Sequence, residues 1–132
     1  MIDSTKAASI KLYPDGPDHG AAVVSNVTFK NVVVQNSDYT LQIQGCYGED
    51  TDYCTLYPST TQLSGIVVKG FSGTTSSKYA PTVANLNCPK SGACGVTFSG
   101  ITVKPPSGTV NYLCADAPTS LGVACSSGAC GK

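Results

Sequence analysis

The sequence predicts an all-β protein: a short right-handed parallel β-helix, or β-solenoid, of about three coils with disulfide-pinned turns. Three observations favour this fold. The 132 residues include 13 Val but a single Glu, and only 12% are charged, a composition that favours strands over helices. A pattern of alternating apolar and polar residues occurs three times, and each copy is followed by another short apolar segment. Stacked repeats of this kind bury one continuous core.

The three copies of the pattern span residues 26–34, 65–73 and 95–103. In each copy the alternation continues on both sides of a polar residue followed by a small one, Lys30-Asn31 in the first copy. Alternation of period two indicates a strand, and a small residue at its centre indicates a bend. Each copy therefore predicts two short strands that meet at a bend.

A third strand is expected in each coil, at residues 39–44, 81–86 and 109–113. The copies start 39 and then 30 residues apart, which fits coils that differ in the length of their turns. The apolar positions expected to face inward are Val27, Phe29, Val32, Val34, Leu41, Ile43, Ile66, Val68, Phe71, Val83, Val96, Phe98, Ile101 and Val103. An antiparallel β-sandwich of the same strands is the competing fold; the repeat favours the solenoid.

The chain divides into an N-terminal segment and turn at 1–20, solenoid coils at 21–113, and a disulfide-bonded cap or tail at 114–132. Pro, Gly, Ser and Cys become frequent from Pro105 onward, which predicts a cap. The residues before Ser9 are too few to cover the cross-section of a coil, so the N-terminal side of the solenoid is expected to be open. An open solenoid end exposes unpaired strand groups, which predicts a homodimer through this end. A partial cover of this end by residues 1–20 is the competing possibility.

Six of the seven cysteines are predicted to form disulfides within the chain. The sequence has one His and no Cys-x-x-Cys, a pattern unlike a zinc site, and disulfides indicate a secreted, extracellular protein. Short loops favour the pairs Cys46–Cys54, Cys88–Cys94 and Cys114–Cys125. Cys130 is then left unpaired and available for an intermolecular bond, although it is also the alternative partner of Cys114. The sequon at Asn26 predicts glycosylation.

The charge balance argues against two classes of partner, nucleic acid and anionic membranes. Eight Lys, with no Arg, balance eight acidic residues, so bulk charge gives no reason to expect binding to nucleic acid or to an anionic membrane. No apolar run approaches the roughly 20 residues of a transmembrane helix. No metal ion and no other cofactor is expected.

Three segments carry a resemblance to a known family: Ser9-Ile10-Lys11-Leu12-Tyr13, Gln44-Gly45-Cys46-Tyr47 and residues 82–88. Together with the solenoid pattern and the cysteines, they resemble the pectin-degrading glycoside hydrolases of family 28, above all fungal exo-polygalacturonases and rhamnogalacturonases. The likeness runs from about Ser9 onward and covers the last third or so of a full-length member.

That family has four motifs: Asn-Thr-Asp, Asp-Asp, Gly-His-Gly and Arg-Ile-Lys. The first three are absent from this sequence, and the fourth survives as Ser9-Ile10-Lys11 with Ser in place of Arg. The resemblance implies that Lys11 contacts a galacturonate carboxylate and that Tyr47 lines the sugar site. Glycoside hydrolysis needs a pair of carboxyl groups across the scissile bond, and the family takes that pair from motifs absent here. The resemblance therefore implies no catalytic residue in this chain.

The carboxylates of two turn or loop segments are predicted to have structural roles. Asp15 and Asp18 lie among Pro and Gly beside His19, so they are predicted to stabilise a turn rather than to form a catalytic pair, and His19 is expected to be exposed. The acidic run at 49–52 could hold Ca²⁺, but it lacks the spacing of a known calcium loop. We expect a solvated loop pinned by the Cys46–Cys54 disulfide.

Two classes of function remain. The first is a secreted protein of the pectin-hydrolase family that lacks the catalytic aspartates, does not catalyse on its own, and binds acidic polysaccharide weakly. The alternative is a stand-alone fungal binding protein, immunomodulatory or effector-like, that meets a host surface protein on a β-helix scaffold. The catalytic aspartate set discriminates between them, since fold and function separate easily.

Overall fold

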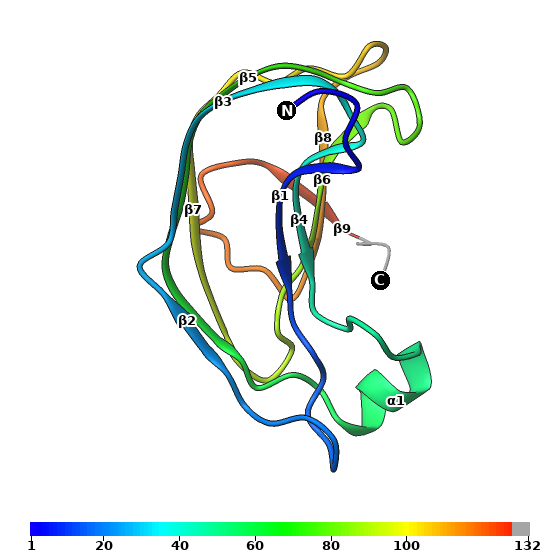
Figure 1. Ribbon diagram of the computed structural model, residues 1–132, viewed down its shortest axis with the longest axis vertical. Helices are drawn as coiled ribbons and strands as arrows, with labels where there is room; N and C mark the ends of the chain where they lie inside the picture. Colours follow the sequence, from blue (N-terminus) through cyan, green and yellow to red (C-terminus); the bar gives the residue numbers. More distant parts are fainter. Residues whose placement is uncertain (128–132) are drawn as a thin grey trace.

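The computed structural model describes residues 1–127 and consists almost entirely of strands (Figure 1). In chain order the elements are β1 (Lys6–Lys11), β2 (Val23–Ser25), β3 (Thr28–Ser37), β4 (Tyr39–Gln44), α1 (Thr51–Leu56), β5 (Gln62–Thr75), β6 (Thr82–Asn87), β7 (Ala93–Ile101), β8 (Asn111–Ala115) and β9 (Cys125–Ser127).

The strands form two sheets that face each other across the core (Figure 1). The five-stranded sheet has the order β1-β4-β6-β8-β9. In the four-stranded sheet, β5 pairs with β2 and β3 on one side and with β7 on the other. The pairings between these strands are parallel throughout, and from β3 to β8 the chain alternates between the sheets. The expected parallel β-helix is confirmed, and the antiparallel sandwich is excluded.

Each expected pair of short strands is one continuous strand with a bend inside it. The bends lie at Asn31 (φ 55°), Gly70 (φ 68°) and Gly100 (φ 60°), which are stacked because β3, β5 and β7 are paired in register around them. Left-handed backbone is open to glycine and tolerated by asparagine, whereas a branched side chain clashes there. The small residue of each repeat is therefore required by the backbone.

The core contains the apolar positions expected from the repeat. Ten of them are buried: Val34, Leu41, Ile43, Ile66, Val68, Phe71, Val83, Val96, Phe98 and Val103. The remaining four are partly buried and pack against this core: Val27, Phe29, Val32 and Ile101.

The N-terminal segment contains more structure than the sequence predicted. Strand β1 pairs with β4 and buries Ala8 and Ile10. The residues before β1 bind the end of β3, where the Gln35 amide donates to the Met1 carbonyl (2.8 Å) and the Asp3 amide donates to the Gln35 carbonyl (2.9 Å). Residues 1–11 thus form part of a coil, while β2, with Val23 exposed, lies at the edge of the four-stranded sheet. Self-association there stays a prediction.

The three expected disulfides are present: Cys46–Cys54, Cys88–Cys94 and Cys114–Cys125. Cys130 lies outside the described residues. The third disulfide joins β8 to β9, and the intervening segment closes the core because Leu121 is fully buried and its carbonyl accepts from the Phe98 amide (2.7 Å). This segment therefore packs onto the core at β7, and its role as a cap stays a prediction.

Truncation of Phe71 tests the stacked core. Its side chain is 0% exposed on the central strand β5, so Phe71→Ala should lower the free energy of unfolding by about 3–5 kcal/mol. Val33→Ala is the control, because Val33 is 54% exposed and surface changes usually stay within about 0.5 kcal/mol. Urea unfolding with the disulfides intact measures both. Equal midpoints for the two variants would contradict the core assignment.

Candidate functional site

The two residues assigned to sugar binding meet at the end of β1. Ile10 and Leu12 are buried, so Lys11 between them faces outward, as alternation along a strand requires. The Tyr47 amide donates to the Leu12 carbonyl (3.0 Å), which fixes the start of the loop after β4. As a result, Lys11 Nζ lies 3.1 Å from the Tyr47 hydroxyl and 4.4 Å from the centre of its ring.

The hydrogen bond from Lys11 changes the acidity of Tyr47. That bond, together with the Lys11 charge, lowers the pKa of the Tyr47 hydroxyl because both stabilise the phenolate, and the charge of Lys6 adds to the effect. Lys6 Nζ also donates to Gln44 Oε1 (3.0 Å). One ammonium group, that of Lys11, therefore contacts the phenol, while that of Lys6 is bound to the side chain of Gln44. Positive charge of this kind suits an anionic ligand.

Lys6 is a site residue that the sequence did not indicate. It lies five residues before Lys11, ahead of the segment that carries the family resemblance, and is level with Tyr39 in the sheet. Only the side-chain contact between Lys6 and Gln44 brings it to the site. Recognition of Lys6–Lys11 as a strand would not have placed Lys6 at the site, because residues five apart in a strand face opposite sides of the sheet.

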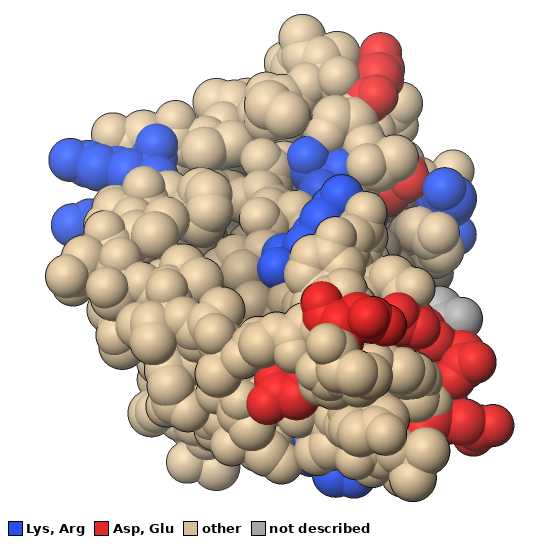
Figure 2. Space-filling view, turned by 60° about the horizontal axis from the view of Figure 1, so that its bottom comes forward, with Lys and Arg blue, Asp and Glu red and all other residues tan. Residues whose placement is uncertain are grey.

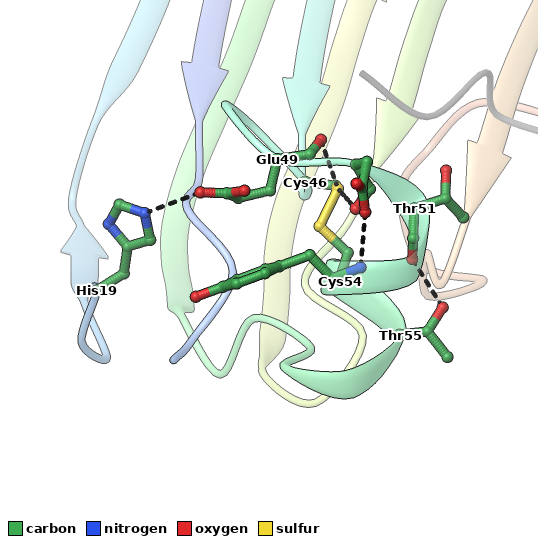
Figure 3. The surroundings of a disulfide bond; sticks show 8 residues. His19, Cys46, Glu49, Thr51, Cys54 and Thr55 are labelled. Carbon is green, nitrogen blue, oxygen red and sulfur yellow. Dashed lines mark hydrogen bonds and ion pairs between the residues drawn. A yellow bond between two sulfur atoms is a disulfide. The ribbon is translucent and has the colours of Figure 1, made fainter. Parts of the chain in front are cut away.

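An aromatic group continues the site on the other side of Tyr47. Tyr13 meets Tyr47 edge-on, with ring centres 5.4 Å apart, and stacks on His19 at 4.5 Å. His19 Nε2 lies 3.6 Å from Glu49 Oε1, and Figure 3 shows Glu49 reaching from the disulfide-bonded loop to this ring. His19 lies in a turn as expected, but it packs between Tyr13 and Glu49, whereas the sequence predicted that it would be exposed.

Asp15 and Asp50, two carboxylates of this region, have structural partners. Asp15 accepts hydrogen bonds from the backbone amide and hydroxyl of Thr60, which ties the turn to the segment before β5. Asp50 accepts from the Tyr53 amide (2.8 Å) and caps α1. The acidic run 49–52 therefore starts a short helix, where the sequence predicted only a loop. Within residues 1–127, no group of three or more His, Cys, Asp or Glu could hold a metal ion.

Two hollows on the outside of the five-stranded sheet share Gln44. The first, of about 460 Å³, lies along Tyr47, Glu49 and Asp50. The second, of about 320 Å³, is lined by Thr5, Lys6, Asp38, Tyr39, Gln42, Gln44, Lys78, Tyr79 and Asn85. Figure 2, which brings the α1 end forward, shows lysines near the centre of the view and a run of acidic side chains beside them.

Residues 1–127 match the family described as glycosyl hydrolases family 28. The chain belongs to this family. It is 60% identical over 131 residues to endo-xylogalacturonan hydrolase A of Aspergillus tubingensis and 59% identical to the probable endo-xylogalacturonan hydrolase A of Aspergillus niger. Each match covers 99% of this chain and 32% of the relative, so the chain spans about a third of their length.

The fold of this family-28 chain also matches a solved structure. The crystal structure of endo-xylogalacturonan hydrolase from Aspergillus tubingensis superposes with a TM-score of 0.97 and 60% identity, covering 99% of this chain and 35% of that one. The family resemblance drawn from the sequence is confirmed, although these relatives act on xylogalacturonan by name rather than being exo-polygalacturonases or rhamnogalacturonases. In the described part of the chain, no helix is long and apolar enough to cross a membrane.

The sequon residue lies away from the lysine site. Asn26 is exposed between β2 and β3 and has a left-handed backbone conformation (φ 56°). Its backbone amide donates to the Ser64 carbonyl (3.0 Å). Attachment of a glycan there stays a prediction.

The contact between Lys11 and Tyr47 predicts a tyrosine titration. Because Lys11 stabilises the phenolate, Lys11→Met should raise the pKa of Tyr47 toward its ordinary value. NMR of tyrosine labelled with carbon-13 at Cζ follows each ring separately. Lys69→Met, which removes an exposed lysine of β5 in the other sheet, is the control and should leave Tyr47 unchanged. A Tyr47 midpoint that stays fixed in Lys11→Met would refute the contact.

Proposed function

We propose that this chain is part of a secreted pectin hydrolase and binds an acidic galacturonan weakly through Lys11 and Tyr47, without catalysing hydrolysis on its own. The observation that carries the proposal is the contact of Lys11 Nζ with the Tyr47 hydroxyl at 3.1 Å, and the charge of Lys6 acts on the same hydroxyl. Ammonium groups attract the uronate carboxylate, and the phenol offers a hydrogen bond to a sugar hydroxyl.

Weak affinity is expected from the exposure of this site. An exposed ion pair between lysine and carboxylate contributes about 0.2–1 kcal/mol, and Ser9 stands where the family pattern has an arginine. Without the planar guanidinium the carboxylate loses its bidentate partner. We therefore expect a dissociation constant of about 1 mM or weaker, which corresponds to a binding free energy of roughly 4 kcal/mol or less.

The absence of turnover is proposed from the carboxylates in reach. An inverting glycosidase needs two carboxyl groups about 6.5–9.5 Å apart with a water molecule between them. Asp15 is committed to Thr60, Asp50 to the cap of α1, and Glu49 to His19. Hydrolysis by the whole protein, with xylogalacturonan as its substrate, is proposed from the relatives' names. A host surface protein as partner stays a prediction.

The first test is turnover and binding by the purified chain. We expect no reducing sugar to be released from polygalacturonate or xylogalacturonan. An NMR titration with an oligogalacturonide should show binding that weakens with added salt and falls by at most about fivefold in Lys11→Ala. Lys69→Ala, the exposed lysine of the other sheet, serves as the matched control.

Two results would count against the proposal. Turnover that is abolished by Asp15→Asn or Asp18→Asn would show a catalytic pair within this chain. Equal affinity of Lys11→Ala and the unchanged chain would remove Lys11 from the binding site.

A further inference from the structure

His19 lies behind a carboxylate that borders the Lys11–Tyr47 contact. Glu49 lines the first hollow together with Tyr47, and His19 is not among the residues that line it. His19 Nε2 lies 3.6 Å from Glu49 Oε1, and Figure 3 shows the two side chains pointing toward each other. The imidazole is therefore placed to act on a ligand in this hollow through the charge of Glu49.

The turn that carries His19 is fixed by contacts that do not involve its imidazole. The His19 amide donates to the Gly16 carbonyl (3.4 Å), and Asp15 is bound to Thr60. Gly16 has a positive φ (145°), and any side chain there would overlap the hydroxyl of Tyr53 in α1. The position of the turn therefore does not depend on the charge of the imidazole.

The ionised side chains that face His19 are carboxylates. Glu49 faces it from the loop after β4, and the exposed Asp18 precedes it in the turn. From α1, the Tyr53 hydroxyl lies within reach of both charges: burial raises its pKa, and the charges of Glu49 and Asp18 raise it further. Tyr13 covers one face of the imidazole, with ring centres 4.5 Å apart. A proton on His19 would thus enter negative surroundings.

Glu49 is the carboxylate of the first hollow whose charge depends on His19 for compensation. Asp50, which also lines the hollow, accepts from the Tyr53 amide and caps α1, whereas Glu49 pairs with His19. The two paired side chains are 24% and 33% exposed, His19 and Glu49 respectively, so water screens their interaction only in part. Because like charges repel, an uncompensated Glu49 opposes any anion bound beside it.

We propose that His19 is a positioning residue that strengthens the binding of an anionic galacturonan in acid. Protonated His19 holds Glu49 and neutralises its charge, whereas neutral His19 leaves Glu49 to repel the carboxylate of the ligand. The change adds one proton to the imidazole and alters no covalent bond to carbon. The inference rests on the proposed function, since Lys11 and Tyr47 must hold the ligand beside Glu49.

The direction with pH follows from which groups change their charge. An imidazole exchanges its proton between about pH 5 and about pH 8, whereas carboxyl groups ordinarily titrate near about pH 4. The chain contains a single His. Across the imidazole range the ligand therefore keeps its negative charge while His19 gains its positive charge. Binding should tighten by about two- to fivefold in acid, the range for one exposed ion pair.

The test is an NMR titration with an oligogalacturonide at constant ionic strength. It is run at about pH 5.5 and at about pH 7.5, toward the two ends of the range in which imidazole titrates. The unchanged chain should bind more tightly at the lower pH. A fully methyl-esterified oligogalacturonide has no carboxylate, so its affinity should be the same at both values.

Four variants assign the pH response to the pair. His19→Gln stays neutral and should bind weakly at both pH values. His19→Arg stays charged, and its planar group stacks on aromatic rings and pairs with carboxylates, so it should bind tightly at both. Glu49→Gln removes the repulsion and should also bind tightly at both. The matched control is Asp52→Asn, which removes an exposed carboxylate of the same acidic run that does not line the hollow and should keep the response.

Each outcome decides the inference. Equal affinity of the unchanged chain at the two pH values overturns it, as does a pH response that persists in His19→Gln or appears with the methyl ester. His19→Arg that binds as weakly as His19→Gln also overturns it, because charge is then not the cause. In these cases the proposed function remains if Lys11→Ala still weakens binding. If the oligogalacturonide binds at neither pH, both fail together.

Discussion

Parallel pairing of each strand with the equivalent strand one coil later is the constraint on which the rest of this structure depends. It fixes which side chains become neighbours, since a shift of one residue would turn every side chain to the opposite face. The register of β1 on β4 sets Lys11 level with Gln44, and the register of β4 on β6 sets Gln42 level with Asn85. The Lys11–Tyr47 site and the buried pair of Gln42 and Asn85 are products of the same alignment. Phe71 and Val68 keep that alignment by filling the interior of the central strand.

Much of this fold could be predicted because the backbone makes strong demands on the sequence. The left-handed bends accept Asn31, Gly70 and Gly100 and reject most other residues, so the repeat is visible without an alignment. The short disulfide loops were likewise expected, because few partners lie within reach of Cys46 or Cys88. The pairing of Lys11 with Tyr47 followed from the family resemblance, and the structure adds the contact between them.

Other features could not be predicted, for physical reasons. Strand β1 reads Lys-Ala-Ala-Ser-Ile-Lys, a segment with little β propensity, and it is a strand because β4 offers it a parallel edge. Helix α1 has six residues and no buried face, so it leaves no periodic signal; its Asp50 cap and the disulfide hold it in place. The reach of Lys6 to Gln44 and the pairing of Asp38 with Lys78 join residues distant in sequence. Local patterns contain no information about such contacts.

Stacked coils interact mainly with their neighbours, so stability need not be uniform along the axis of the solenoid. Within residues 1–127, β1 has β4 as its only strand neighbour in the five-stranded sheet, whereas β4 lies between β1 and β6. Lys6 and Lys11 belong to β1. Gln44 is the last residue of β4, and Tyr47 lies in the loop that follows it. A ligand that contacts these residues bridges the two strands from outside. Binding of the ligand and ordering of β1 against β4 are then thermodynamically coupled. Hydrogen exchange at β1 would then report the occupancy of the site, and affinity would carry the entropic cost of ordering β1 against β4.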